Sequence, residues 1–157
     1  MEKIRLGVIG TGLAWERLHY PAIKELRDKY EIAALANRTR ADAEKFAQLI
    51  HLDQKNVYED YRELLKRDDI DAVDILVPIG MNYRVSADAA ASGKDFICEK
   101  PLAPDMEQAE KFLDLFRNTE LKIMIAENYR YNEENNILRQ LVSQGRVGDI
   151  VYFIRNN

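Results

Sequence analysis

Short apolar runs alternate with longer amphipathic segments along most of this sequence. The runs have the length of strands and lie at residues 4–9, 31–37, 56–58, 72–77, 95–98 and 121–126. The segments between them have the apolar spacing of helices and lie at 13–29, 40–49, 61–66, 83–92 and 104–118. Strands that are apolar along most of their length are typical of a sheet covered on both faces. The alternation therefore predicts right-handed crossovers and a doubly wound, mostly parallel α/β sheet.

Charge and cysteine content argue against several classes of protein. The net charge is −4 and the sequence pI is about 5.3, so we expect no binding to nucleic acid or to anionic membranes. Cys98 is the single cysteine, which excludes an internal disulfide and, without metal-spaced partners, gives no reason to expect a metal. The N-terminus runs directly into a strand pattern without a signal peptide, and no run reaches the length of a membrane span. These features favour a cytoplasmic protein.

A glycine-rich turn joins the first apolar run to the first helical segment. Gly10 permits a tight turn, and the missing Cβ of Gly12 lets a pyrophosphate approach the backbone. The N–H groups at the start of the following helix, at Leu13 and Ala14, can then bind phosphate oxygens. This pattern predicts a Rossmann-type nucleotide site. Trp15 replaces the third glycine of the usual fingerprint, so the contact between helix and strand should change.

The end of the second strand indicates which nucleotide binds, since the glycine turn also suits S-adenosylmethionine in a methyltransferase. NAD-selective sites usually place a carboxylate here to bind the ribose hydroxyls, and so do methyltransferases. This chain instead has Asn37, Arg38 and Thr39, followed by Arg40. Arginine pairs strongly with a 2′-phosphate, and the amide and hydroxyl can add neutral hydrogen bonds. The sequence therefore favours NADP, keeps NAD as the alternative cofactor, and disfavours a methyltransferase.

Several further motifs follow one another along the chain. The most specific is Gly-Lys-Asp-Phe-Ile-Cys-Glu-Lys-Pro-Leu-Ala at 93–103, and the others lie at 10–12, 19–23, 71–78, 128–132 and 145–150. Together they resemble the glucose-fructose oxidoreductase / inositol dehydrogenase / MocA (Gfo/Idh/MocA) family of sugar and polyol dehydrogenases, over the whole chain. The resemblance implies an NAD(P)-dependent oxidoreductase that transfers a hydride to or from a sugar, a polyol or a related hydroxy compound. It also implies that the full-length protein forms a homo-oligomer.

The Glu-Lys-Pro element carries the chemistry that this resemblance implies. Lys100 is expected beside the nicotinamide, as the catalytic and substrate-binding residue that stabilises charge developing during hydride transfer. Glu99 is expected to position the cofactor or Lys100, and the peptide bond before Pro101 is expected to be cis. Without the surrounding motifs, Glu99 and Lys100 would indicate no more than an exposed ion pair at the end of a strand.

Other residues receive roles from the same resemblance. Asn82 stands where many members have histidine; it can hydrogen-bond but cannot titrate, and it is expected to line the nicotinamide side of the site. Arg130 is expected either to bind a substrate oxygen or to act as a strut between domains, and His19 to pack and hydrogen-bond rather than to catalyse. The expected cofactor-binding residues are Gly10, Gly12, Leu13, Ala14, Asn37, Arg38, Thr39, Val77, Pro78, Ile79, Asn82, Glu99, Lys100 and Asn128.

The final segment differs from the rest because six strands already complete a sheet before it. A helix is expected at 133–144 and a strand at 150–154. We interpret 1–127 as the NAD(P)-binding Rossmann domain. Residues 128–157 are interpreted as the start of a truncated C-terminal substrate and oligomerisation domain, an α+β domain of which only the first helix and strand are present. A strand without its partners is expected to be disordered, to dock on a neighbouring molecule or to pair in a non-native dimer.

The sequence lacks one feature that the resemblance leads us to expect. The family's acid/base pair, Asp-x-x-x-His on a helix of the second domain, does not occur in this sequence. We therefore expect this chain to bind its cofactor without turnover. The alternative function is a non-catalytic dinucleotide-sensing or regulatory module, because a fold alone does not fix function. Lys100 argues against that alternative, since a sensor does not need a lysine beside the nicotinamide.

Overall fold

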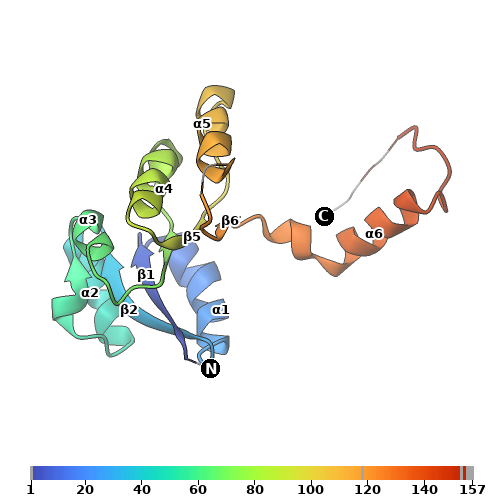
Figure 1. Cartoon of the computed structure of the whole chain (residues 1–157). Coiled ribbons are helices and arrows are strands. Elements are labelled where there is room, and N and C mark those ends of the chain that lie inside the picture. Colours follow the sequence, from blue (N-terminus) through green and yellow to red (C-terminus); the bar gives the residue numbers. More distant parts are fainter. Residues whose placement is uncertain (1, 118, 153, 155–157) are drawn as a thin grey trace. The chain divides into compact units, whose positions relative to one another are not determined.

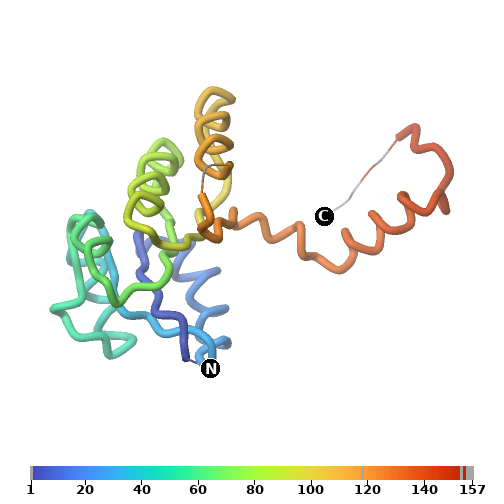
Figure 2. Tube along the Cα trace, in the orientation of Figure 1, coloured from blue at the N-terminus to red at the C-terminus, as the bar shows by residue number. Residues whose placement is uncertain are grey.

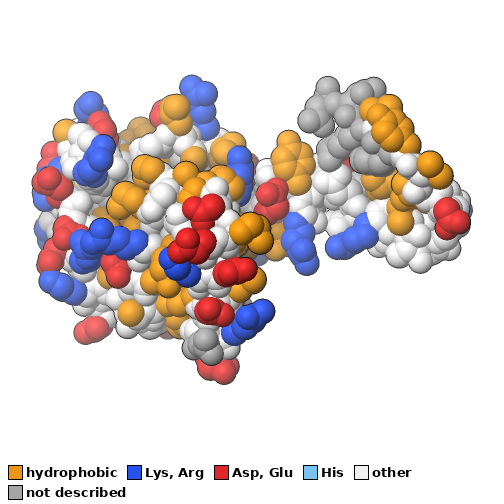
Figure 3. All heavy atoms as spheres, turned by 90° about the horizontal axis from the view of Figure 1, so that it is seen from above, with side chains coloured by type: hydrophobic (Ala, Val, Ile, Leu, Met, Phe, Trp, Pro, Cys, Tyr) orange, Lys and Arg blue, Asp and Glu red, His pale blue; other side chains and the backbone are white. Residues whose placement is uncertain are grey.

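The computed structural model describes residues 2–117, 119–152 and 154. Contacts between Cα atoms divide the chain into two units, Met1–Ala126 and Glu127–Asn157. The first unit is a sheet flanked by helices (Figure 1), and the tube in Figure 2 shows the chain passing through a helix between successive strands. Basic and acidic side chains are intermixed over the face of this unit seen in Figure 3. In the described part of the chain, no helix is both long and apolar enough to cross a lipid bilayer.

The sheet of the first unit confirms the predicted doubly wound α/β fold. In the described residues it has six strands, all parallel, in the order β3-β2-β1-β4-β5-β6. They are β1 (Ile4–Ile9), β2 (Tyr30–Ala36), β3 (Val57–Tyr58), β4 (Ala72–Ile75), β5 (Asp95–Cys98) and β6 (Ile123–Ile125). The strand order reverses between β1 and β4. In folds of this kind, ligands bind at the carboxyl ends of the strands beside such a reversal.

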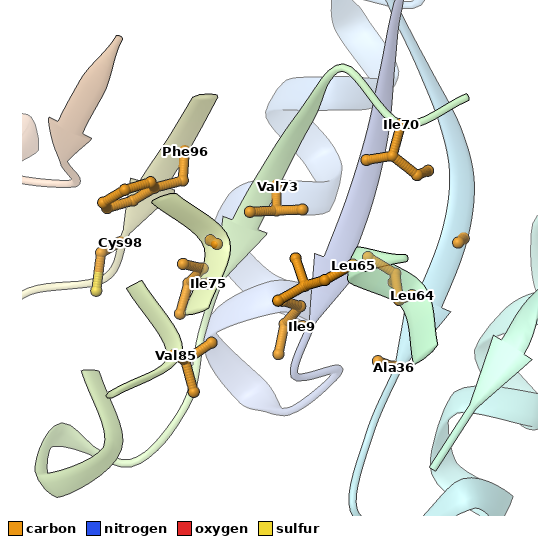
Figure 4. Close-up of a cluster of buried hydrophobic side chains, with 12 residues drawn as sticks. Ile9, Ala36, Leu64, Leu65, Ile70, Val73, Ile75, Val85, Phe96 and Cys98 are labelled. Carbon is orange, nitrogen blue, oxygen red and sulfur yellow. The ribbon is translucent and has the colours of Figure 1, made fainter. Parts of the chain in front are cut away.

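Two clusters of buried side chains, one on each face, hold the helices to the sheet. Neighbouring residues of β1 belong to different clusters, because successive side chains of a strand point to opposite faces: Val8 lies in one cluster and Ile9 in the other. Figure 4 shows Ile9 packed among residues that include Leu64 and Val85 from two helices. The helices on the Ile9 face are α3 (Tyr61–Leu65), α4 (Asn82–Ala91) and α5 (Met106–Arg117), and those on the Val8 face are η1 (Trp15–His19), α1 (Tyr20–Glu25) and α2 (Arg40–Leu49).

Trp15, which departs from the glycine fingerprint, is fully buried on the Val8 face. Its ring packs against Tyr20 and Phe46, with centroid distances of 5.8 and 5.5 Å. The helix around it is a π-helix, at whose end the N–H of Tyr20 donates to the carbonyl of Trp15. Pro21 has no N–H to donate, and the regular helix α1 restarts with this proline in its first turn. A wide helical turn thus accommodates the indole in the core.

An ion pair ties the start of β1 to the residue before β4. The carboxylate of Asp71 accepts hydrogen bonds from the backbone N–H of Arg5 at 2.7 Å and from its guanidinium at 2.7 and 3.1 Å. These hydrogen bonds lower the pKa of Asp71 to about 2. Because the folded pKa lies below the unfolded value of about 3.9, the pair stabilises the fold above about pH 4 and loses this effect as the pH falls towards 2.

Asp71→Asn is therefore expected to destabilise the protein at pH 7 and to have less effect at about pH 2.5. Both side chains of the pair are 40% exposed, so the expected loss at pH 7 is below about 1 kcal/mol. Urea denaturation of wild type and variant at the two pH values measures it, with Asp68→Asn, also at an exposed aspartate, as the control. An equal loss at both pH values would contradict the assignment to the ionised carboxylate.

The second unit contains one helical turn, η4 (Asn128–Tyr131), followed by α6 (Glu133–Ser143). Asn132 caps α6, because its side-chain oxygen accepts from the N–H groups of Glu134 and Asn135. Gly145, with a φ of 67°, follows the end of the helix, as is common for this residue. The expected helix is thus confirmed, whereas the domain boundary placed after residue 127 stays a prediction.

The strand expected at 150–154 is not formed by the described residues of that segment, which are 150–152 and 154. Phe153 lies outside the described residues. The apolar side chains of the segment are exposed, Val151 to 95%. A strand persists only where its backbone groups pair with a neighbour, and within the described residues no strand pairs with this segment. The described residues 150–152 and 154 therefore do not form the expected strand, because no strand among the described residues pairs with them.

Candidate functional site

The turn after β1 is fixed by hydrogen bonds on both sides. The N–H of Gly10 donates to the carbonyl of Ala36 at the end of β2, and the N–H of Leu76 donates to the carbonyl of Ile9, both at 2.8 Å. Gly10 has a φ of 104°, which residues with a side chain rarely adopt. A Cβ at this position would collide with the carbonyl oxygen of Leu76. The fold itself therefore requires glycine here.

Gly12, two residues later, stands next to open space. A Cβ there would meet no atom within 4 Å. The hydroxyl oxygen of Thr11 is buried and has no hydrogen-bond partner among the described residues. The helix begins at once, with the N–H of Glu16 donating to the carbonyl of Gly12 at 3.0 Å, so the first N–H groups of this helix have no acceptor within it. Free space, an unpaired hydroxyl and unpaired N–H groups fit the pyrophosphate of a dinucleotide.

The residues after β2 differ in how far their side chains are already paired. The amide of Asn37 donates to the carbonyl of Thr39 at 3.2 Å. The guanidinium of Arg40 bonds to Glu44 at 2.6 Å, one turn along α2. Arg38 is exposed, and its side chain has no partner within the described ranges. Of the two arginines, Arg38 is therefore the one whose charge is available to an anionic ligand.

Lys100 lies in the turn after β5 and is exposed. Its side chain has no hydrogen bond or ion pair with another described residue. The Lys100–Pro101 peptide bond is cis, which confirms the expectation. The preceding residue continues the sheet, because the N–H of Glu99 donates to the carbonyl of Ile75 in β4 at 2.9 Å. A free ammonium group at this edge of the sheet can bind and stabilise a negatively charged oxygen.

Asn82 holds the backbone on either side of Lys100. It is the first residue of α4 and only 1% exposed. Its amide nitrogen donates to the carbonyl of Glu99 at 3.1 Å and to the carbonyl of Pro101 at 3.0 Å. Both amide protons are thus used within the protein. The expected contact between Asn82 and the nicotinamide stays a prediction, and the hydrogen bonds to the turn are a role that sequence reasoning missed.

Three ionisable side chains meet on the Val8 face of the sheet. The Nδ1 atom of His19 lies 2.8 Å from a carboxylate oxygen of Asp74, and its Nε2 atom lies 3.2 Å from one of Glu99. Burial lowers the pKa of His19, but the hydrogen bonds and charges of both acids outweigh it, so the net pKa is raised. Burial raises the pKa of Asp74, and His19 opposes that rise. His19 thus has the hydrogen-bonding role that was expected.

The sequence reasoning missed Asp74, although one signal was present. A carboxylate in the middle of an otherwise apolar strand is rarely left unpaired. Its partner could not be identified, because His19 is 55 residues away in the chain. The sequence also could not show that the carboxylate of Glu99 contacts His19, because the two residues are 80 positions apart.

The topology brings most of the expected cofactor-binding residues to one edge of the sheet. β2, β1, β4 and β5 are neighbours, and the expected residues follow their carboxyl ends: Gly10, Gly12, Leu13, Ala14, Asn37, Arg38, Thr39, Val77, Pro78, Ile79, Glu99 and Lys100. Asn128 and Arg130 belong to the second unit, so their expected contacts stay predictions. Among the described residues, this edge has the open turn at Gly12, the unpaired guanidinium of Arg38 and the unpaired ammonium group of Lys100, and these groups fit a phosphorylated redox cofactor.

The sequence matches a protein-family model over residues 4–127, described as "Oxidoreductase family, NAD-binding Rossmann fold" (GFO_IDH_MocA). An oxidoreductase from Thermotoga maritima has a solved structure that is similar to this one, with a TM-score of 0.88 and 38% sequence identity. The similarity covers 94% of this chain and 45% of that protein.

Two further solved structures are similar to this one and contain a cofactor. The scyllo-inositol dehydrogenase of Lactobacillus casei, with bound NAD(H) and scyllo-inositol, has a TM-score of 0.84 and 26% identity over 95% of this chain and 43% of that protein. A variant of a 3-ketoreductase from Actinomadura kijaniata, in complex with TDP-benzene and NADP, has a TM-score of 0.81 and 30% identity over 95% of this chain and 45% of that protein. The chain spans 41 to 44% of the length of the first curated relatives that it matches.

Proposed function

Because the chain belongs to the Gfo/Idh/MocA family of oxidoreductases, with an NAD-binding Rossmann fold, we propose that it is the cofactor-binding part of a dehydrogenase with a preference for NADP(H). The substrate of the whole protein is a sugar, a polyol or a related hydroxy compound, as the names of the relatives suggest. The observation that carries the proposal is the turn at Gly12, which leaves open space at the carboxyl edge of the sheet. Bound NADP(H) supplies the hydride-transferring nicotinamide ring.

The chain's own residues have separate tasks in this proposal. The backbone at Gly12 and the first N–H groups of the following helix bind the pyrophosphate. Arg38 pairs with the 2′-phosphate, because its guanidinium has no competing partner among the described residues. The ammonium group of Lys100 binds the substrate oxygen and stabilises the negative charge that develops on it. The side chains of Arg38 and Lys100 have no partner among the described residues, and each of these groups follows the carboxyl end of a strand.

The proposal extends to the longer protein that the relatives suggest. Residues from 128 onward begin a second domain, which supplies most of the substrate site and the contacts of a homo-oligomer. Arg130 binds a substrate oxygen in that setting. The cytoplasmic location and the absence of turnover in the 157-residue chain stay predictions.

Titration of the chain with NADPH and NADH tests the cofactor assignment. We expect tighter binding of NADPH, and we expect Arg38→Ala to weaken NADPH binding by about tenfold while changing NADH binding little, because one charge-assisted contact is lost. Arg40→Ala is the matched control, since Arg40 is already paired with Glu44. Isothermal titration calorimetry measures all six dissociation constants. Tighter binding of NADH by wild type, or an equal loss in both variants, would argue against the preference for NADP.

A further inference from the structure

The group formed by His19, Asp74 and Glu99 is well protected from water. The three side chains come from η1, from the middle of β4 and from the residue after β5, and they are 12%, 2% and 13% exposed. Each ring nitrogen of His19 contacts a different carboxylate. Among the described residues, no other charged group contacts these three side chains; Glu16 and Arg17 on the same helix, and Lys100 beside Glu99, are exposed.

The hydrogen-bond pattern determines how many protons this group holds. An ionised carboxylate can only accept a hydrogen bond, and a neutral imidazole has only one N–H to donate. A neutral imidazole between two ionised carboxylates could therefore make only one of the two hydrogen bonds. Contacts from both ring nitrogens to carboxylate oxygens require one additional proton in the group. That proton belongs on the imidazole, because an imidazolium donates to both acids and offsets the cost of burying two negative charges.

The same contacts fix the backbone next to Lys100. Glu99 is held at three points: its N–H by Ile75, its carbonyl by Asn82, and its carboxylate by His19. His19 belongs to a helix on the Val8 face, and Asn82 belongs to α4 on the Ile9 face. The turn from Glu99 to Pro101 is thus held from both sides of the sheet. Lys100 has no side-chain contact of its own with a described residue, so its direction depends on these neighbours.

We propose that His19 is a positioning residue for Lys100: as an imidazolium it joins the carboxylate of Glu99 to Asp74 and so sets the direction in which the turn presents the lysine. The consequence for function rests on the role proposed above for Lys100. Since the folded pKa of His19 is raised, the arrangement is complete below about pH 6.5 and is lost as the pH rises through the folded value.

Nuclear magnetic resonance of the uniformly ¹⁵N-labelled, cofactor-free chain tests the inference. We expect both ring nitrogens of His19 to be protonated at pH 6, because the hydrogen bonds and charges of Asp74 and Glu99 raise the pKa of the ring above its usual value. The backbone amide signals of Glu99 and Lys100 should shift with the same midpoint as the His19 ring. A His19 ring with a single N–H at pH 6, or a Lys100 amide signal that does not follow the His19 titration, would overturn the proposal.

Variants separate positioning from general destabilisation. Glu99→Gln and Asp74→Asn each remove one negative charge but keep an acceptor oxygen, so we expect the proton dissociation constant of His19 to rise about tenfold in both, with the Lys100 amide following. His51→Asn is the control, because asparagine suits the φ of 57° at this position. In this variant, the titration of the His19 ring and the pH dependence of the Lys100 amide signal should not change. His19→Gln should remove the pH-dependent shift of Lys100. An unchanged pH dependence of the Lys100 amide signal in all three site variants would also refute the proposal.

The experiments distinguish failure of this inference from failure of the proposed function. The protonation and the turn are measured without cofactor, whereas the proposed function requires wild type to bind NADPH. Wild type that fails to bind NADPH while the backbone amide signal of Lys100 follows the titration of His19 would refute the proposed function alone. Wild type that binds NADPH while Lys100 ignores His19 would refute the inference alone.

Discussion

Gly12→Val is expected to weaken NADPH binding by more than about 100-fold while leaving the fold intact. The new side chain would enter the space that a pyrophosphate needs, and a Cβ at this position meets no atom within 4 Å. A loss of this size corresponds to about 2.7 kcal/mol of binding free energy. Calorimetric titration measures the affinity, and thermal denaturation measures the stability of the same sample.

Ala22→Val is the matched control for this experiment. It adds valine at an exposed position of α1, later in the same helical segment, and should leave the NADPH affinity within about threefold of wild type. If Gly12→Val bound NADPH as tightly as this control, the pyrophosphate could not lie against Gly12. The proposed site would then have to be abandoned, even with the fold unchanged.

Gly10→Ala is expected to destabilise the protein itself, by about 3 kcal/mol or more. Its φ of 104° is unfavourable for alanine, and the new Cβ would collide with the carbonyl oxygen of Leu76. Neither partner can move without loss, since Gly10 is hydrogen-bonded to Ala36 and Leu76 to Ile9. Urea denaturation of the cofactor-free chain measures the change in the free energy of unfolding.

Gly12→Ala is the comparison that shows whether the positive φ and the collision at Gly10 cause the destabilisation. The same methyl group is added two residues later, where it has free space and no positive φ. We expect a change in stability below about 1 kcal/mol, because surface substitutions away from strained positions have small effects. Equal destabilisation by the two alanines would mean that the turn is not constrained in the way the structure indicates.

Local patterns in the sequence predicted most of the fold. The expected segments 4–9, 40–49 and 95–98 match β1, α2 and β5 residue for residue, because each is recognisable from its own local run of residues. The predictions were weaker where contacts between residues that are distant in the sequence determine the local structure. The π-helix at Trp15 depends on packing against Phe46 in α2, and the expected strand at 150–154 depended on a partner that the described residues do not supply.

The residues of the candidate site also fall into those that local motifs identified and those that depend on contacts between distant parts of the sequence. Gly10, Gly12 and Lys100 were identifiable because turns and motifs are local in sequence. The hydrogen bonds of Asn82 to Glu99 and Pro101 span 17 and 19 residues, and those of His19 span 55 and 80. Such contacts follow from strand order, which no single segment encodes. The residues that support the lysine were therefore harder to recognise than the lysine itself.

The buried indole of Trp15 makes the chain its own optical reporter. It is the single tryptophan of the sequence, it is shielded from water, and it lies three residues beyond the turn assigned to the phosphates. Fluorescence excited in this ring has one source, and its emission overlaps the absorption of a reduced nicotinamide. Quenching of tryptophan emission by energy transfer should therefore report occupancy by NADPH directly, without a label.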